Sequence, residues 1–209
     1  TRKGTLLVNL GSPDSTEISD VRKFLREFLM DRRVLDTPWL IRFVVVHLLI
    51  LPFRPRASAE AYRKVWTPEG SPLVVISRQV TEALRSRVKL PVQLAMRYQN
   101  PSIENGIEAL LRDGVDEILL IPLFPHYAMS SYETAVEKVK AVLRQKAPDA
   151  SLVVQPPYFD RPDYIHALAE SAQASLDDGF DHLMISFHGI PERHLRKSAP
   201  TCSHCLQTP

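Results

Sequence analysis

Short apolar runs alternate along this chain with segments in which apolar residues recur at helical spacing. The apolar runs cover 5–10, 91–98, 117–124, 151–155 and 182–187. Each run is closed by glycine, proline or a polar residue before the next helical segment begins. Strands that alternate with helices in this way form parallel sheets whose two faces are covered by the helices. The sequence therefore predicts an α/β fold with a parallel sheet and helices on both faces.

The segments between these runs carry the usual start and stop signals of helices. We predict helices over 18–30, 58–66, 73–88, 102–112, 130–145 and 162–176. Pro72 precedes the third of them, where proline suits the first turn because its fixed φ is helical. Gly114 and Gly179 follow helices, at the position where a residue with positive φ commonly ends a helix. The stretch from Pro156 to Pro162 predicts a linker.

Polar side chains stand at or near the carboxyl end of every predicted strand. They are Asn9, Arg97, Tyr98, His126, Tyr127, Gln155 and His188. Parallel strands end at the same edge of a sheet, and ligands of open α/β sheets bind beyond that edge. We therefore expect these groups to converge on a site. The imidazole of His188 can be neutral near pH 7 and can then accept a proton or bind a metal; a histidine that only hydrogen-bonds its loop is the alternative.

Charge and motif content argue against several classes of function. Lys and Arg number 26 and Asp and Glu 24, so no excess of positive charge favours nucleic acid. The turn at Gly11 lacks the further glycines of a dinucleotide fingerprint and the Gly-Lys-Ser/Thr of a P-loop. The two cysteines, Cys202 and Cys205, do not support a secreted disulfide framework. The chain starts at Thr1 and reaches a predicted strand at Thr5, so we expect no signal peptide and a truncated chain.

The most apolar segment runs from Trp39 to Phe53. It is shorter than the roughly 20 residues that a membrane-spanning helix needs. Two interpretations stay open: a buried helix, or an exposed apolar lip that touches a membrane or an apolar ligand. Arg54 and Arg56 follow at once, and basic residues beside an apolar helix suit lipid head groups or ligand carboxylates. The alternative is that Arg54 and Arg56 lie on a solvated loop and bind no ligand. The two arginines by themselves favour this alternative.

Seven segments, in this order and spacing, carry a resemblance to a known family. They are 7–13, 28–34, 62–66, 70–73, 96–98, 122–127 and 186–191. Together they resemble the ferrochelatases, and segments 31–33 and 186–191 are similar to the bacterial branch. Members of this family insert ferrous iron into a porphyrin to make haem. The resemblance implies that Fe²⁺ and protoporphyrin IX are the substrates and that the product is protohaem, in the last step of haem biosynthesis.

The resemblance also implies roles for individual residues in catalysis. His188 matches the family's metal-coordinating, proton-accepting histidine, and Arg97 and Tyr98 match a pair that lines the porphyrin cleft. Metallation replaces two pyrrole N–H protons with one Fe²⁺, so an imidazole that faces the ring nitrogens can accept protons or hand over the metal. His188 is therefore the expected catalytic residue and metal ligand.

Other matched positions would hold the porphyrin. Leu10 matches an apolar position that faces the macrocycle, and Ser130 matches a small residue against the ring. Arg54 matches a basic residue near the propionates. The segment from Trp39 to Phe53 resembles the apolar lip at the cleft mouth, which in the family is associated with membrane contact. The implied localisation is cytoplasmic, with peripheral contact to the inner membrane as a further expectation.

The resemblance further implies a Rossmann-like chelatase fold built from two similar domains. Residues 1–160 would form the N-terminal domain, and 161–209 a linking helix and the beginning of a second domain that is incomplete in this chain. The family's active site also uses a glutamate from the second half, beyond Pro209. We therefore expect the chain to be inactive by itself.

Several alternatives stay open at this point. Cys202 and Cys205 supply two of the four ligands that a [2Fe–2S] cluster needs, so a loop with unrelated thiols is favoured over a cluster. A cobalt or nickel chelatase would act on a more carboxylated tetrapyrrole, which the apolar lip does not suit. A porphyrin-binding protein without catalysis is the alternative from another class. A nucleotide-binding domain has the least support, because the chain shows no phosphate-binding loop.

Overall fold

The computed structural model describes residues 1–177 and 179–198. Its strands are β1 (Lys3–Gly11), β2 (Val92–Tyr98), β3 (Glu117–Pro122) and β4 (Ser151–Val154). They form one sheet in the order β2-β1-β3-β4, and every neighbouring pair is parallel. The predicted parallel sheet is thus confirmed for the first four apolar runs.

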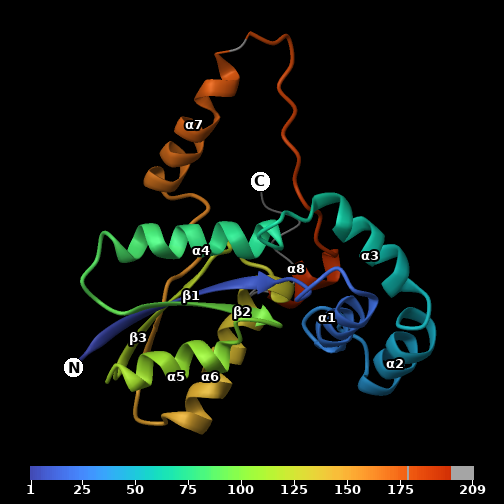
Figure 1. Ribbon diagram of the computed structural model, residues 1–209, viewed down its shortest axis with the longest axis horizontal. Helices are drawn as coiled ribbons and strands as arrows, with labels where there is room; N and C mark the ends of the chain where they lie inside the picture. Colours follow the sequence, from blue (N-terminus) through green and yellow to red (C-terminus); the bar gives the residue numbers. More distant parts are fainter. Residues whose placement is uncertain (178, 199–209) are drawn as a thin grey trace.

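Helices cover both faces of this sheet, as predicted (Figure 1). The α-helices are α1 (Ile18–Met30), α2 (Trp39–Val44), α3 (Arg54–Val65), α4 (Pro72–Arg85), α5 (Ile103–Arg112), α6 (Thr134–Lys146), α7 (Pro162–Leu176) and α8 (Glu192–Ser198). Two π-helical segments, η1 (Val45–Ile50) and η2 (Met129–Glu133), continue α2 and precede α6. The π-helical geometry was not predicted, since the sequence carries no signal for it.

The core forms because successive side chains of a strand point to opposite faces. Leu6 and Val8 of β1 pack against α5 and α6, and Leu7 packs against the side of α4. All three side chains are buried. A central strand that is apolar on both faces requires cover on both, so the continuous apolar run in β1 dictates the layered architecture.

Local signals explain the bounds of α5 and the start of α3. Ser102 caps α5 by accepting a hydrogen bond from the backbone N–H of Asn105 at 3.2 Å. Gly114 has a φ of 75° just after that helix, as expected for a helix stop. The helix predicted over 58–66 begins earlier, at Arg54, because Pro55 lies in its first turn and is buried. Arg54 and Arg56 therefore lie on a helix and not on a loop.

Helices α1, α2 and α3 lie beyond the carboxyl ends of β1 and β2 (Figure 1). Helix α1 packs against α3, and its side chains Val21 and Phe24 are buried. Phe24 also makes an edge-on contact with the Tyr98 ring, with ring centroids 6.3 Å apart. This group of helices is therefore fixed directly against the edge at which parallel sheets bind ligands.

The prediction of a fifth strand over 182–187 is wrong. Helix α7 stands away from the sheet, and the chain returns through 179–191 to α8 without regular structure (Figure 1). Among the described residues, no strand pairs with this segment. Its side chains are exposed, with Met184 at 91% and Phe187 at 79%. An apolar run becomes a strand only where a neighbouring strand pairs its backbone, and the described part of the chain offers none here.

Candidate active site at the carboxyl edge of the sheet

The last residue of β1 is a glycine that lies directly opposite the end of β2. Gly11, the last residue of β1, is opposite Tyr98, the last residue of β2. Its φ is 105°, and a Cβ atom at this position would lie 2.0 Å from the carbonyl oxygen of Tyr98. Glycine is therefore required here on two grounds, the backbone conformation and the space. The close approach fixes where Arg97 and Tyr98 leave the sheet.

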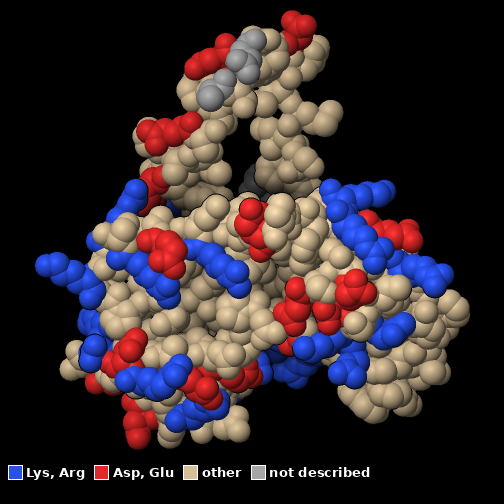
Figure 2. Space-filling view, in the orientation of Figure 1, with Lys and Arg blue, Asp and Glu red and all other residues tan. Residues whose placement is uncertain are grey.

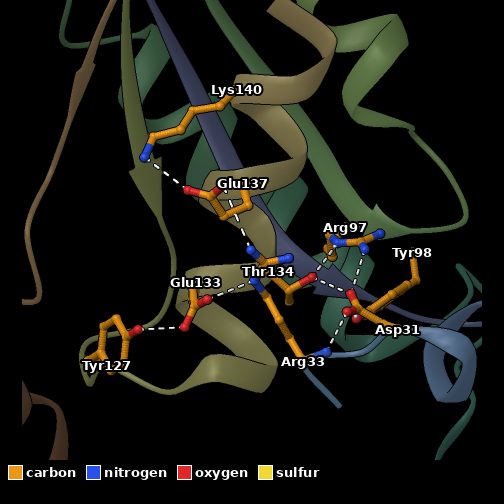
Figure 3. A network of polar contacts seen from close by, with 9 residues as sticks. All are labelled: Asp31, Arg33, Arg97, Tyr98, Tyr127, Glu133, Thr134, Glu137 and Lys140. Carbon is orange, nitrogen blue, oxygen red and sulfur yellow. Dashed lines mark hydrogen bonds and ion pairs between the residues drawn. The ribbon is translucent and has the colours of Figure 1, made fainter. Parts of the chain in front are cut away.

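Asp31, the residue that follows α1, lies at the centre of the polar contacts at this edge (Figure 3). Its Oδ2 atom accepts hydrogen bonds from Arg97 Nη2 at 2.6 Å, from the Tyr98 hydroxyl at 2.9 Å, and from the Thr134 hydroxyl. Its Oδ1 atom accepts from the backbone N–H of Arg33 at 2.8 Å. One side chain thus joins the loop after α1, the end of β2 and the start of α6.

This arrangement keeps Asp31 ionised. Burial alone would raise the pKa of Asp31, but the hydrogen bonds from Thr134 and from the Arg33 backbone, together with the Arg97 charge, lower it below its ordinary value. The Asp31 side chain is 5% exposed. Burial raises the pKa of Tyr98, so this phenol stays protonated and remains a donor. The site therefore contains a buried carboxylate with a full set of donors.

Arg97 is held on several sides. Its Nε atom donates to the Thr134 hydroxyl at 2.7 Å, and its guanidinium lies 4.4 Å from the centre of the Tyr98 ring. Nη1 lies 3.9 Å from a carboxylate oxygen of Glu27. The Arg97 charge is therefore compensated within the protein. Arg97 and Tyr98 form a fixed, internally neutralised wall of the edge, and Arg97 is not an unpaired cation.

A second chain of contacts continues from Arg33 (Figure 3). Arg33 Nε donates to Glu133 Oε1 at 2.8 Å, and its Nη2 lies 3.7 Å from a Glu137 oxygen. Tyr127 donates from its hydroxyl to the other Glu133 oxygen at 2.6 Å, and Lys140 lies 3.0 Å from Glu137. These contacts tie η2 and α6 to the loop after α1.

An apolar pocket of about 540 Å³ adjoins this edge. Its walls come from α1, η1, the turn before α3 and α3 itself: Leu25, Phe28, Leu29, Leu49, Ile50, Phe53, Arg54, Ala57 and Ser58. Phe28 links the pocket to the Asp31 network, since its ring meets the Tyr98 ring edge-on at 5.2 Å between centroids. Arg54 is the single charged residue among those walls. The pocket can therefore take an apolar ligand that carries an anionic group at one end.

The segment from Trp39 to Phe53 is an exposed apolar lip beside this pocket. Trp39, Leu48 and Phe53 are 61%, 62% and 77% exposed. Figure 2 shows a surface without charged residues over α2, with Lys and Arg at its margin. Of the two interpretations of the sequence, the buried helix is wrong and the partial exposure of the segment is confirmed, whereas its contact with a membrane or an apolar ligand stays a prediction. None of the described helices is long and apolar enough to span a bilayer.

The structure brings some of the predicted site residues together and leaves others apart. Arg97 and Tyr98 share the Asp31 network. Leu10 is half-buried near the end of β1, and Ser130 is half-buried in η2. Arg54 is exposed at the start of α3, on the wall of the pocket.

His188 does not lie at the end of a strand, as the sequence predicted. It is exposed in the segment between α7 and α8, so the sheet does not position it. Of the other polar strand ends, Asn9 donates to the hydroxyl of Ser77 on α4 at 3.0 Å, and His126 stacks on Phe159. Of these predicted polar residues, Arg97 and Tyr98 therefore lie together at the edge, whereas Asn9, His126 and His188 do not join them.

Sequence reasoning missed the residues that organise the site. Asp31 and Thr134 were given no role, because they are 66 and 37 residues away from Arg97 and no local spacing relates them to it. The available signal was the occurrence of Asp31 within the 28–34 segment, directly after an amphipathic helix. A buried carboxylate needs hydrogen-bond donors, and those of Asp31 come from the end of β2, from Thr134 at the start of α6 and from the backbone of Arg33.

No group of three or more His, Cys, Asp or Glu side chains within residues 1–177 and 179–198 is arranged to hold a metal ion. Cys202 and Cys205 lie outside the described residues, so the prediction about a [2Fe–2S] cluster stays a prediction.

A parallel sheet whose carboxyl edge adjoins an apolar pocket with one cationic wall defines an α/β protein with a small-molecule site. The ferrochelatase family model matches residues 2–209, and the chain belongs to the ferrochelatase family. The ferrochelatase of Stutzerimonas stutzeri strain A1501 is 48% identical over 208 residues, which cover 99% of this chain and 61% of that protein.

Two other ferrochelatases are similar to this chain to about the same extent. That of Ectopseudomonas mendocina strain ymp is 50% identical over 203 residues, covering 97% of this chain and 59% of the relative. That of Azotobacter vinelandii strain DJ is 52% identical over 202 residues, covering 96% of this chain and 60% of the relative. The chain thus spans about three fifths of the length of these relatives.

Proposed function

We propose that the protein to which this chain belongs inserts ferrous iron into protoporphyrin IX to form protohaem, the last step of haem biosynthesis. Family membership supports this activity. The observation that carries the proposal is the contact of Phe28 with Tyr98, which joins an apolar pocket to a rigid polar strand end. A flat macrocycle with anionic side groups needs both features on one continuous surface.

The reaction exchanges two pyrrole N–H protons for one Fe²⁺ ion. An imidazole can accept a proton or pass on the metal, and we assign this role to His188. Its exposure leaves the ring accessible to a ligand. Leu10 and Ser130, both half-buried near the edge, would contact the faces of the macrocycle.

The charges suggest where the propionates would lie. Arg97 is already neutralised by Asp31, whereas Arg54 is exposed on the wall of the apolar pocket. A carboxylate gains more from an arginine that is not already paired with a buried aspartate, because no existing ion pair has to be broken. We therefore place the propionates toward Arg54, and the hydrophobic part of the ring toward Phe28.

The exposed lip supports a further proposal about location. Trp39, Leu48 and Phe53 form an apolar surface with Arg54 and Arg56 next to it. Apolar side chains flanked by basic ones bind the interface of an anionic membrane. We propose a cytoplasmic protein that contacts the inner membrane peripherally through this lip, where it would meet an apolar substrate.

The test uses the full-length gene product under anaerobic conditions. Protoporphyrin IX and Fe²⁺ are supplied, and haem formation is followed by absorption; we expect turnover with many cycles per protein molecule. Competition with Co²⁺ and Ni²⁺, and with coproporphyrin and a more carboxylated tetrapyrrole, defines the substrates. Tight porphyrin binding without metallation would indicate a porphyrin-binding protein. A preference for cobalt or nickel with the carboxylated substrate would indicate a different chelatase. We further propose that residues 1–209 alone do not turn over.

A further inference from the structure

Two buried carboxylates in the loop after α1 hold two separate parts of the molecule. Asp31 and Asp36 have side chains that are 5% and 6% exposed. Asp31 holds Arg97 and Tyr98, as described above. Asp36 instead faces α8, the short helix that follows the segment with His188. A single short loop therefore contacts both the fixed wall of the site and the helix next to its proposed catalytic residue.

The loop that carries Asp31 and Asp36 is itself held in place by hydrogen bonds. The backbone N–H groups of Val34 and Leu35 donate to the carbonyl oxygen of Asp31 at 3.1 and 3.0 Å. The buried guanidinium of Arg42 donates to the carbonyl oxygens of Leu35 at 3.0 Å and of Thr37 at 2.9 Å. These bonds connect Asp31 to Asp36 and both to α2.

Asp36 binds one face of α8. Arg193 Nε lies 2.6 Å from Asp36 Oδ1, and Lys197 Nζ lies 2.7 Å from Oδ2. Arg193 and Lys197 are four residues apart and so share a face of the helix. His194 is buried on the same helix, with Nε2 3.7 Å from Asp36 Oδ1. The hydrogen bond from Lys197 is the main cause that lowers the pKa of Asp36 to about 2, so both ion pairs persist at neutral pH.

His188 is tied closely to this helix. The backbone N–H of His194 donates to the carbonyl oxygen of Pro191 at 2.9 Å, so the first turn of α8 is bonded to Pro191. Only Gly189 and Ile190 separate His188 from Pro191. Successive Cα atoms are 3.8 Å apart, so the Cα atom of His188 lies within about 11 Å of that of Pro191. Whatever fixes α8 therefore limits the positions that His188 can reach.

We propose that Asp36 is a positioning residue, which clamps α8 through Arg193 and Lys197 and thereby holds His188 over the edge formed by Arg97 and Tyr98. This proposal rests on the proposed function of His188 and extends it. Within the described residues, the segment 182–187 pairs with no strand, whereas α8, which begins four residues after His188, is paired with Asp36. The clamp acts on His188 through the same loop that fixes Arg97 and Tyr98.

The helix offers a matched control. Arg196 also lies on α8, but its ion pair is with Glu192 at 3.7 Å on the exposed side, and not with Asp36. In the full-length gene product, Arg193→Ala and Lys197→Ala remove contacts to Asp36, whereas Arg196→Ala makes the same change of charge away from it. Hydrogen exchange of peptides that cover 182–190 reports on the clamp whether or not the protein metallates porphyrin. We expect about tenfold faster exchange in the first two variants and no change in Arg196→Ala.

Kinetics supply the second measurement. Loss of the clamp should lower kcat about tenfold by misplacing His188, while the Kd for protoporphyrin, measured by fluorescence, stays the same because Asp31 still holds Arg97 and Tyr98. Lys197→Arg, which keeps a cation opposite Asp36, should retain most of the kcat that Lys197→Ala loses. Circular dichroism confirms that each variant is folded.

The outcomes separate the two proposals. If the parent protein does not metallate porphyrin, the proposed function fails, while the exchange measurement still decides whether the clamp exists. If exchange over 182–190 is equally slow in Arg193→Ala, Lys197→Ala and Arg196→Ala, the clamp is refuted. A rise in Kd with unchanged kcat would likewise refute it, because that result would mean that α8 binds substrate and does not position His188.

Discussion

The hydroxyl of Tyr98 donates a hydrogen bond of 2.9 Å to Asp31 Oδ2, across 67 residues of sequence. The same oxygen also accepts from Arg97 and Thr134. A carboxylate oxygen with three donors depends on its negative charge, since a neutral amide oxygen accepts more weakly. The position of the last two residues of β2 therefore depends on one ionised side chain in another part of the chain.

The first prediction concerns the charge of Asp31. Asp31→Asn in the full-length protein should lower the free energy of unfolding by about 3 kcal/mol, because it leaves the mostly buried Arg97 without its compensating charge. Urea unfolding followed by fluorescence measures this change. Asp163→Asn, which removes the partner of Arg161 on the surface, should leave the free energy unchanged. Equal effects of the two substitutions would contradict the central role of Asp31.

The pH dependence of stability provides a second prediction. Asp36 has a pKa of about 2 in the folded protein, below its ordinary value of 3.8. Because the pKa of Asp36 is lower in the folded than in the unfolded protein, the ionised side chain stabilises the fold. This stabilisation is fully present above pH 4 and is lost as the pH falls toward 2. The difference in unfolding free energy between the parent and Asp36→Asn should therefore be constant from pH 7 to pH 5 and shrink below pH 4. Unfolding curves at several pH values measure it; a difference that grows as the pH falls would contradict the assignment.

The third prediction tests the close approach of β1 to β2. Gly11→Ala should cost about 3 kcal/mol or more, because the added Cβ meets the carbonyl oxygen of Tyr98 and the φ is also unfavourable. Gly70 has a similar φ of 120°, but nothing lies within 4 Å of a Cβ placed there. Gly70→Ala should therefore cost only about 1 kcal/mol for the backbone conformation. Thermal unfolding of both variants separates the collision from the conformational effect.

His188 gives the fourth prediction. His188→Ala in the full-length protein should lower kcat for iron insertion at least about 100-fold, because we assign the acceptance of the pyrrole protons to this imidazole. The fold should be unaffected, since the side chain is exposed. His166 is exposed on α7, where its Nε2 atom lies 3.2 Å from a carboxylate oxygen of Glu170, so His166→Ala serves as the control with normal turnover. Near-normal activity of His188→Ala would defeat the assignment.

The lip leads to the fifth prediction. Replacing Leu48 and Phe53 by serine should weaken binding to vesicles of phosphatidylethanolamine and phosphatidylglycerol about tenfold, because two exposed apolar side chains no longer enter the interface. Co-sedimentation with vesicles measures the binding. Val153, which is 50% exposed on the edge strand β4, lies away from the lip, so Val153→Ser should bind as the parent does. Unchanged binding of the lip variant would refute the membrane proposal.

Much of the fold followed from the sequence because its signals are local. The four paired strands are apolar runs that end in glycine, proline or polar residues, and α7 begins and ends where the sequence predicted it. The run at 182–187 has the same pattern and is not a strand. Whether an apolar run pairs depends on a neighbour, and the pattern within the run does not contain that information.

The candidate site was predictable only where a strand end marked it. Arg97 and Tyr98 were found in this way, whereas Asp31 and Thr134 were not, because their relation to Arg97 exists only after folding. The composition of the lip also did not decide whether it is buried or exposed. Apolar residues from Trp39 to Phe53 suit a core and an exposed patch equally, and the exposure of Trp39, Leu48 and Phe53 in the folded chain decides between the two.

The internal pairing of Arg97 has a consequence for how quickly a dianionic molecule can find this surface. A cation that is already matched by a carboxylate creates little long-range field, so ionic strength should have small influence on events at the strand end. The exposed arginines at the rim, Arg54 and Arg56, create the attraction that acts at a distance. Added salt should thus slow the encounter with such a molecule more than it shortens the lifetime of the complex.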